Sequence, residues 1–483
     1  MKRAPFVGRE KEISGLQRLL KKKVASLVTV QGRRRIGKSR LIEEFARRSG
    51  YNFYRFSGLP PKPGLVSKDQ KTEFARSLKE QFGFKDISSS DWGDLFNFLA
   101  LQVGKGKSIV LLDEISWMAE GDPAFLGKLK NAWDIHFKEN PKLILVLCGS
   151  VSSWIENNIL RNTGYVGRVS HSIFLEELSL QESSQLLKRL GAYFSSWETF
   201  LILSITGGVP RYLEEIDVSE TAEGAIRQLC FRKEGLLFRE FENMFSELFS
   251  KKSSYLKKII EALRERNLSY SEICSVMGVE KSSHVLEWLE ELVQSGFLSR
   301  DYTWNIRDAK ESKLSRYRIK DNYIRFYLKY IHPNAGKIQK GHFEEYSLSS
   351  LSGWNTIMGF QFENLILSNR KWIIEKLGLK SEEILGDNPF FQSRTKRHKS
   401  CQIDYLIQTK FNTLYVCEIK YSRKEISSKI LKEMKEKIDR LSTPKGYSCR
   451  PVLIHLSGVS ESVETSGYFS NIIDLNEFLE TNE

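Results

Sequence analysis

The stretch SLVTVQGRRRIGKSRLIEEFARR, residues 26–48, decides the fold of the N-terminal part of the chain. It begins with a largely apolar run that is typical of a β-strand, and it ends with apolar residues at helical spacing, Leu41, Ile42, Phe45 and Ala46. The residues between them match the phosphate-loop pattern, with its key positions at Gly32, Gly37, Lys38 and Ser39. Strand, loop and helix in this order predict an α/β fold with a nucleotide site at the start of the helix.

The residue types of this loop fit a triphosphate. Glycines let successive backbone N–H groups point at phosphate oxygens, Lys38 should reach the β- and γ-phosphates, and the Ser39 hydroxyl should complete a Mg²⁺ shell. We therefore expect ATP and Mg²⁺ as cofactors. The predicted cofactor-binding residues are Gly32, Arg35, Ile36, Gly37, Lys38, Ser39 and Arg40.

The variable positions of the loop hold three arginines, residues 33–35. Their side chains could contact the nucleotide, but side chains at such positions often point to solvent. We assign them no specific side-chain role and expect mainly a locally positive field.

A second strand-like run, residues 109–112, ends in Asp113 and Glu114. A carboxylate at the end of a strand beside the phosphate loop can hold Mg²⁺ through water, and the next one can polarise the attacking water. The sequence thus predicts Asp113 as the metal residue and Glu114 as the hydrolytic base.

Two further residues are candidates in ATP hydrolysis. Ser150 ends the strand-like run 142–150, where it could sense the γ-phosphate or orient water, or could simply belong to a strand-end turn. Arg168 precedes another strand-like run and could stabilise transition-state charge as an arginine finger. A structural salt bridge is the alternative role for Arg168.

Composition limits the class of protein. A chain of 483 residues with 41% hydrophobic residues should form two to four globular domains. A formal net charge of +14 favours polyanionic partners such as nucleic acid, although lysine-rich solvated faces would give the same balance. The six cysteines have no spacing typical of a zinc site or a disulfide framework. No signal peptide or spanning apolar run is evident, so we expect a cytoplasmic protein without a membrane partner.

Five segments together resemble the archaeal-type ATPases, a branch of the STAND class related to AAA+ proteins. They are FVGREKEISGL (6–16), GRRRIGKSRL (32–41), LLDEISWM (111–118), LCGSVSSW (147–154) and TGGVPRYLEEID (206–217). The resemblance covers about residues 4–330. It implies a switch in which ATP binding reorganises the core against a helical lid that contains Gly207, Gly208 and Pro210, with the first segment near the adenine. A protein partner or self-association through the ATPase is a further expectation.

The middle of the chain predicts a winged helix. Helical segments at 253–267, 269–278 and 281–294 precede strand-like residues 296–305 and 315–321. The helix that would read DNA carries acidic residues that repel phosphates, Glu287, Glu290 and Glu291, so DNA contact and a pure packing role both stay open. The aromatic residues that follow have helical spacing and should be core, namely Tyr323, Phe326, Tyr327 and Tyr330.

Near the C-terminus, residues 401–408 and 413–420 are two strand-like runs joined by a short polar link. A hairpin turning near Phe411 would put Asp404 opposite Glu418, and Lys420 would share a face with Glu418. Two carboxylates about 5 Å apart repel each other unless a cation lies between them, and Mg²⁺ prefers such ligands. Lys420 could orient a metal-bound water or stabilise charge on a phosphodiester.

A preceding helical segment, residues 355–378, carries Glu363. Helix-borne Glu, then Asp, then Glu-x-Lys resembles the PD-(D/E)XK nuclease superfamily over about residues 355–483. The resemblance implies Glu363, Asp404, Glu418 and Lys420 as catalytic residues, although Ile403 stands where the motif has proline. The basic stretch 393–400 could contact phosphates or be a solvated loop. A nuclease-like fold that has lost its activity is the alternative.

The expected fold class is therefore α/β with three parts: a P-loop NTPase parallel sheet with a helical lid, a winged-helix domain, and a C-terminal α/β restriction-endonuclease-like domain. The expected bounds are 1–215 for the ATPase core and the start of the lid, 216–250 for a helical connection, 251–330 for the winged helix, 331–354 for a linker and 355–483 for the nuclease-like domain. The expected function is an ATPase switch that couples nucleotide state to DNA binding and Mg²⁺-dependent DNA cleavage. A regulator that does not cleave DNA, with the last domain as a docking module, is the alternative.

Overall fold

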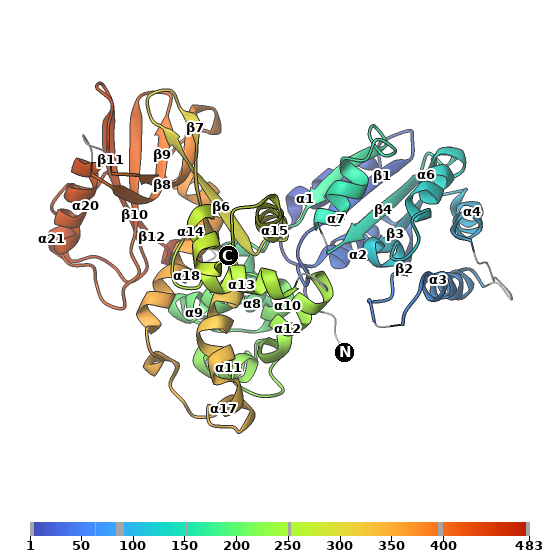
Figure 1. Cartoon of the computed structure of the whole chain (residues 1–483), viewed down its shortest axis with the longest axis horizontal. Helices are drawn as coiled ribbons and strands as arrows, with labels where there is room; N and C mark the ends of the chain where they lie inside the picture. Colours follow the sequence, from blue (N-terminus) through green and yellow to red (C-terminus); the bar gives the residue numbers. More distant parts are fainter. Residues whose placement is uncertain are drawn as a thin grey trace.

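The computed structural model describes residues 4–62, 64–83, 91–150, 152–249, 253–394 and 399–479. Two β-sheets lie toward opposite ends of the molecule, with a body of helices between them (Figure 1). None of the helices in these ranges is both long and apolar enough to cross a membrane.

The N-terminal sheet is entirely parallel and has the order β2-β3-β4-β1-β5. Its strands are β1 (Ser26–Gln31), β2 (Asn52–Ser57), β3 (Ser108–Asp113), β4 (Leu143–Gly149) and β5 (Val169–Phe174). The three inner strands β1, β3 and β4 are buried at every position, because helices cover both faces of the sheet.

One face of this sheet packs against α1 (Glu10–Leu19) and α2 (Lys38–Ser49). The other face packs against α3 (Ser67–Phe82), α4 (Trp92–Val103) and α6 (Phe125–Ile135). Short helices follow β3, at α5 (Ile115–Met118), and β4, at α7 (Ser152–Ile155). The short helix η1 (Phe137–Glu139) follows α6, and η2 (Glu156–Leu160) follows α7. The α/β fold with a parallel sheet is confirmed.

A group of helices follows β5, and we call this group the lid after the expectation from the sequence: α8 (Leu180–Leu190), α9 (Ser196–Thr206), α10 (Pro210–Leu213), α11 (Ala222–Cys230) and α12 (Leu236–Phe249). Ser179 and Ser195 start α8 and α9 with capping boxes. Gly207 ends α9 in the left-handed conformation, and Pro210 occupies the first turn of α10.

The next part, which we call the helix–hairpin segment, comprises α13 (Ser253–Ala262), α14 (Tyr270–Met277), α15 (Ser283–Gln294), β6 (Leu298–Asn305) and β7 (Lys310–Ile319). Strands β6 and β7 pair with each other in antiparallel fashion. The order of these elements agrees with the order expected from the sequence.

Short helices connect this segment to the C-terminal part: α16 (Asn322–Phe326), η4 (Tyr327–Ile331), η5 (His332–Asn334), α17 (Ala335–Gln339) and η6 (Leu348–Ser350). The four aromatic residues of α16 and η4 that were expected in the core are buried, so that prediction is confirmed.

The C-terminal sheet is mixed and has the order β12-β11-β10-β9-β8. Its strands are β8 (Ile384–Gln392), β9 (Cys401–Thr409), β10 (Thr413–Ile419), β11 (Ser448–His455) and β12 (Asn471–Asp474). Strands β8 to β10 pair antiparallel, and β10 to β12 pair parallel. Cys417 pairs with Tyr405, so the β9–β10 hairpin is centred on Phe411 and the predicted register is confirmed.

Helices flank this second sheet. The helix α18 (Trp354–Ser368) lies against β10, and α20 (Lys429–Arg440), which connects β10 to β11, lies against β9. Smaller elements are α19 (Arg370–Lys376), η7 (Ser381–Glu383), α21 (Glu461–Glu464) and α22 (Asn476–Leu479).

One continuous apolar core joins the lid, the helix–hairpin segment, α18 and one face of the C-terminal sheet, with members such as Leu203, Leu289, Phe362 and Ile454. The N-terminal sheet has two clusters of its own that are separate from this core. The chain before α8 contributes Val7 and Leu178 to the large core.

Candidate functional site

The phosphate loop connects β1 to α2, as the sequence predicts. Gly32 (φ 147°) and Gly37 (φ 92°) adopt backbone conformations that favour glycine, and a Cβ at Gly32 would lie 2.4 Å from the Leu175 carbonyl oxygen. Lys38 is buried, and its ammonium donates to the carbonyl oxygens of Gly32 and Arg33 at 3.0 Å each. The lysine charge is thus held inside the loop.

Ser39 and Asp113 meet at the carboxyl edge of the N-terminal sheet. The Ser39 hydroxyl donates to Asp113 Oδ2 at 2.7 Å, and Arg55 Nη2 donates to the same oxygen at 2.7 Å. A hydroxyl and a carboxylate oxygen are donors that fit Mg²⁺. No sequence motif indicates Arg55, which reaches Asp113 because β2 and β3 are neighbours.

Glu114 and Ser150 also come together, because β3 and β4 are adjacent and parallel. Glu114 Oε2 accepts hydrogen bonds from the Ser150 backbone N–H at 3.0 Å and from its hydroxyl at 2.8 Å. Glu114 has a positive φ of 52°, an uncommon conformation for this residue type. Ser150 thereby holds the carboxylate expected to act as the base.

Arg168 lies elsewhere. It directly precedes β5, whose first residue, Val169, pairs with Leu27 near the start of β1, so Arg168 is at the opposite edge of the sheet from the phosphate loop. Its guanidinium binds Asp134 of α6 through two hydrogen bonds of 2.8 Å and holds the pKa of that carboxyl well below its usual range. This geometry favours the salt bridge over a role at the nucleotide of the same chain.

The arginines of the phosphate loop differ from expectation. Arg33 does not point to solvent: it is 4% exposed and forms ion pairs with Glu177, at 3.3 Å, and with Asp321. Arg35 pairs with the buried Glu240 of α12 at 2.7 Å. The expectation failed because the lid and the residues after β7 cover this side of the loop.

The ionised state of Arg33 is secured by its neighbours. Burial alone lowers the pKa of a guanidinium, but the charges of Asp321 and Glu177 more than offset this, so the pKa of Arg33 is raised. The guanidinium also lies over the Tyr212 and Phe297 rings, 6.0 and 5.8 Å from their centroids.

The other predicted loop residues have separate surroundings. Ile36 is fully buried in the core beneath the loop. Arg40 Nη2 donates to the Ala4 carbonyl oxygen at 2.5 Å, which ties the start of α2 to the N-terminal segment.

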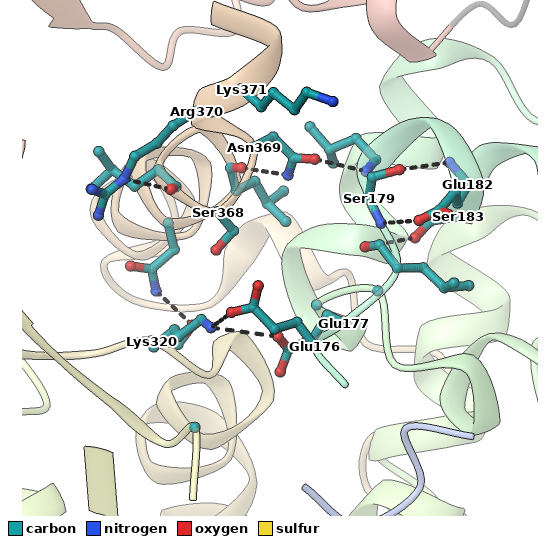
Figure 2. Close-up of a pocket in the computed structure, with 18 of the residues that line it drawn as sticks. Glu176, Glu177, Ser179, Glu182, Ser183, Lys320, Ser368, Asn369, Arg370 and Lys371 are labelled. Atoms are coloured by element: carbon teal, nitrogen blue, oxygen red, sulfur yellow. Dashed lines mark hydrogen bonds and ion pairs between the residues drawn. The ribbon is translucent and has the colours of Figure 1, made fainter. Parts of the chain in front are cut away.

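A cavity of about 1000 Å³ lies where all parts of the molecule meet (Figure 2). On one side Lys320 reaches Glu176 at 3.0 Å and Glu177 at 3.7 Å. On the other side Asn369 Oδ1 accepts a hydrogen bond of 3.1 Å from the Leu180 N–H at the start of α8. Polar contacts therefore connect the end of β5 and the lid to the residues that follow β7 and α18.

The C-terminal sheet brings two predicted carboxylates together. Asp404 and Glu418 adjoin the last pair of the β9–β10 register, which is Tyr405 with Cys417. Asp404 Oδ2 accepts a hydrogen bond of 2.9 Å from the Ile419 N–H. The ammonium of Lys437, from α20, binds Glu418 Oε2 and lies 3.6 Å from Asp404 Oδ1. Burial and the nearby Asp404 raise the pKa of Glu418 to about 7.

Glu363 and Lys420 form no ion pair or hydrogen bond that links them to Asp404 or Glu418 among the described contacts. Burial and the Asp404 charge raise the pKa of Glu363 to about 7, so this residue shares the electrostatic environment of the pair. The Lys420 ammonium pairs with Glu433 of α20 at 3.0 Å, although its charge still lowers the pKa of Glu418. The motif lysine thus binds α20, whereas Lys437 binds the carboxylates.

The two carboxylates, Asp404 and Glu418, are oxygen ligands of the kind that a hard cation such as Mg²⁺ prefers. Among the described residues no three His, Cys, Asp or Glu side chains converge closely enough to hold a metal, so the candidate site has two carboxylates. Mg²⁺ is commonly held by one or two carboxylates and several waters. Residues 395–398 of the predicted basic stretch lie outside the described residues, and Arg394 and Lys399 beside them are exposed.

The predicted DNA-reading helix, α15, lies against α7 of the N-terminal part. Its residues Glu287 and Glu290 are exposed. Part of this helix therefore serves packing, and DNA contact by α15 stays a prediction.

The N-terminal part of the chain is similar to a known family of domains. Residues 6–216 match a family described as an ATPase domain predominantly from Archaea. An uncharacterized protein of Methanocaldococcus jannaschii, MJECL04, is 27% identical over 363 residues, which are 74% of this chain and 76% of that protein. The match to the ATPase-domain family supports ATP binding and hydrolysis, and it confirms the archaeal-type ATPase resemblance for residues 6–216.

Two solved structures are similar to this chain. The Walker-type ATPase PABY2304 of Pyrococcus abyssi superposes with a TM-score of 0.50 at 17% identity, over 68% of this chain and 97% of that one. The ORC2 protein of Aeropyrum pernix has a TM-score of 0.43 at 13% identity, over 71% and 97% of the respective chains. The first likeness shows a P-loop ATPase fold. The winged-helix and nuclease resemblances stay predictions.

Proposed function

We propose that this protein is an ATP-hydrolysing switch whose nucleotide state controls DNA binding and Mg²⁺-dependent DNA cleavage at Asp404 and Glu418. The helix–hairpin segment is its winged-helix domain, and the C-terminal sheet with α18 and α20 is its nuclease-like domain. The observation that carries this proposal is the pairing of Arg33, in the phosphate loop, with Asp321, at the start of α16.

The short helix α16 connects that pair to the carboxylate site. Asp321 caps the helix by accepting a hydrogen bond of 3.0 Å from the Ile324 N–H. The next residue, Asn322, accepts hydrogen bonds from Gln361, at 2.7 Å, and from Asn364, at 3.0 Å, on α18. A shift of α16 therefore acts directly on the helix that carries Glu363.

The far end of α16 carries a second charge. Arg325 is fully buried, and its positive charge lowers the pKa of Glu363 against the effect of burial. A displacement of α16 would change the distance between these two charges. In a buried setting such a change has a large electrostatic effect.

The N-terminal sheet is joined to the rest largely through charged contacts, whereas the remaining parts share one apolar core. Polar interfaces between domains allow relative motion more readily than large apolar ones. ATP would bring several negative charges to the loop that holds Arg33 and Arg35, and would compete with Asp321 and Glu240 for them. We infer that nucleotide binding loosens these pairs and moves α16.

Each residue of the ATP site has a part in hydrolysis. Lys38 would bind the β- and γ-phosphates, Ser39 and Asp113 would hold the metal, and Glu114 would take a proton from the attacking water while Ser150 orients the Glu114 carboxylate. At the C-terminal site Asp404 and Glu418 would hold the metal, and Lys420 would stabilise the charge that builds on the phosphodiester. Mg²⁺, when bound, supplies Lewis acidity at either site.

The test is cleavage of plasmid and single-stranded DNA with Mg²⁺ or Mn²⁺, with and without ATP. We expect cleavage that responds to ATP in the wild type and is lost in Asp404→Ala and Lys420→Ala. Arg33→Met and Asp321→Asn should still cut DNA but should lose the response to ATP. Arg47→Met, an exposed arginine on α2, is the matched control.

Two outcomes would contradict the proposal. Cleavage that survives Asp404→Ala would come from another site or from a contaminant. An unchanged ATP response in both Arg33→Met and Asp321→Asn would remove the coupling through α16.

A second candidate is a regulator that binds DNA in an ATP-dependent way without cutting it. The Lys437 ammonium between the two carboxylates favours this candidate, because an ion pair there could be purely structural. DNA binding without cleavage under every condition of the same assay would support it.

A further inference from the structure

We propose that Lys437 is a displaceable cation of the carboxylate pair, so that its ammonium and a divalent metal compete for the place between Asp404 and Glu418. This inference rests on the metal site of the proposed function. It adds a residue to that site that belongs to neither the Asp nor the Glu-x-Lys motif, and it makes α20 a part of the site.

The geometry has three charged groups in one small space. Lys437 contacts Glu418 and lies 3.6 Å from Asp404, and the three side chains are 28%, 8% and 19% exposed respectively. One ammonium balances one of the two negative charges, whereas a divalent cation would balance both. An ammonium and a metal ion in the same place would repel each other, so one excludes the other.

Lys437 has a route out of the site. It lies near the C-terminal end of α20, and the buried residues that attach this helix to the sheet, Ile430 and Met434, lie in its preceding turns. The flexible lysine stem can turn toward solvent without a shift of the helix, because the side chain is already partly exposed.

A third carboxylate, Glu433, is a possible partner for the displaced ammonium of Lys437. Glu433 precedes Lys437 by four residues on α20, the spacing at which helical side chains become neighbours. In the structure Glu433 pairs with Lys420. If Lys437 moves to Glu433 when the metal enters, Lys420 is released toward the metal and the substrate phosphate.

This exchange accounts for the arrangement of both lysines. Before metal entry Lys437 balances one of the two carboxylate charges, and Lys420 binds Glu433 of α20. After metal entry Lys437 binds Glu433 and Lys420 faces the metal and the substrate phosphate. Metal binding and the positioning of Lys420 are then one event, and Lys437 is a positioning residue.

The test is Mn²⁺ binding to the full-length chain, followed by the electron paramagnetic resonance signal of free Mn²⁺ in the absence of nucleotide and DNA. Binding that disappears in Asp404→Ala reports this site. We expect Lys437→Met to bind Mn²⁺ there about tenfold more tightly than the wild type, since removal of a competing charge a few ångströms away is worth about that factor. Lys432→Met, an exposed lysine on the same helix, should bind like the wild type.

A further variant tests the exchange itself. Glu433→Gln removes the partner that the displaced ammonium would gain, so Mn²⁺ binding should weaken severalfold. Lys437→Gln keeps a polar side chain without the charge and repeats the main test if Lys437→Met unfolds. A circular dichroism spectrum of each variant checks the fold.

The outcomes separate this inference from the proposed function. If the wild type and both Lys437 variants bind Mn²⁺ equally at a site that needs Asp404, the metal site stands and the role of Lys437 is wrong. If none of these chains binds Mn²⁺ in a way that depends on Asp404, the metal site itself is wrong.

Discussion

Arg33 and Lys437 perform related tasks at two distant places, and their chemistry suits each task. Each is a cation between two carboxylates that come from different elements. Arg33 is buried and its guanidinium cannot lose its charge, which suits a contact that holds two domains together. Lys437 is a flexible point charge at a partly open site, which suits a cation that must leave.

Glu363 should make the stability of the folded chain depend on pH. Its pKa is raised to about 7, first by burial and then by Asp404, from an ordinary value of 4.5. The folded chain therefore keeps a proton that the unfolded chain releases. The associated stability is complete below about pH 4.5 and is lost as the pH rises to about 7.

Glu363→Gln should remove this loss because glutamine stays neutral at every pH. We expect the free energy of unfolding to match the wild type near pH 4.5 and to exceed it by roughly 1–3 kcal/mol at pH 8. Urea unfolding at the two pH values, without added metal, measures both numbers. Glu375→Gln, at an exposed position on α19, is the control. A gain that is equal at both pH values would mean that Glu363 is not the titrating group.

At the scale of elements, the sequence predicted what depends on neighbours along the chain. The phosphate loop has a local pattern, and a symmetric hairpin about Phe411 was enough to pair Asp404 with Glu418. The strand-like runs correspond to β1, β3, β4, β9 and β10. Periodicity and turn position are local properties, so they can be recognised without a three-dimensional structure.

The remaining parts of the sites depend on distant residues. Arg33 finds Glu177 and Asp321, which lie 144 and 288 positions further along the chain, and no local pattern indicates such a pairing. Lys437 belongs to a helix with many charged residues, KILKEMKEKIDR, and the sequence does not mark which lysine faces the carboxylates. Arg55 meets Asp113 only because β2 and β3 are neighbours.

A glycine within α18 allows a test of how regular this helix is. Gly359 lies in its interior, and a Cβ there would meet nothing within 4 Å. Glycine within a helix costs about 0.5–1 kcal/mol relative to alanine, so Gly359→Ala should raise the free energy of unfolding by about that amount. The shift of the urea midpoint measures it.

Gly208→Ala is the matched contrast for this prediction. Gly208 has a φ of +76°, and a Cβ there would lie 2.5 Å from the Leu178 carbonyl oxygen, so this change should destabilise the lid by more than about 1 kcal/mol. Destabilisation by Gly359→Ala instead would mean that α18 is not a regular helix at that point.

In the whole molecule, apolar packing joins some parts of the chain and ion pairs join others. The lid, the helix–hairpin segment and the C-terminal part share an apolar core, so they should move together. The N-terminal sheet meets them through ion pairs around the phosphate loop and through the contact of α7 with α15. The phosphate loop therefore lies where these two parts of the chain meet, so a change of charge at the loop acts on the ion pairs that join them.

The position of Arg168 concerns assembly. It lies at the edge of the sheet opposite the phosphate loop of its own chain, so it could reach only the nucleotide of another copy. A head-to-tail contact between copies would bring these two edges together and would generate a ring or a filament. If Arg168 is an arginine finger, ATP hydrolysis must depend on such an assembly.

If Arg168 acts on the nucleotide of a second copy, the hydrolysis rate per chain should rise with protein concentration in the wild type. Arg168→Ala should abolish this rise and lower the rate about a thousandfold, since an arginine finger contributes at least that factor, while ATP binding is unchanged. Asp134→Asn breaks the same salt bridge but keeps the arginine, so it should retain most of the activity. Equal hydrolysis by the wild type and Arg168→Ala at every concentration would leave Arg168 as a structural partner of Asp134, with each chain acting alone.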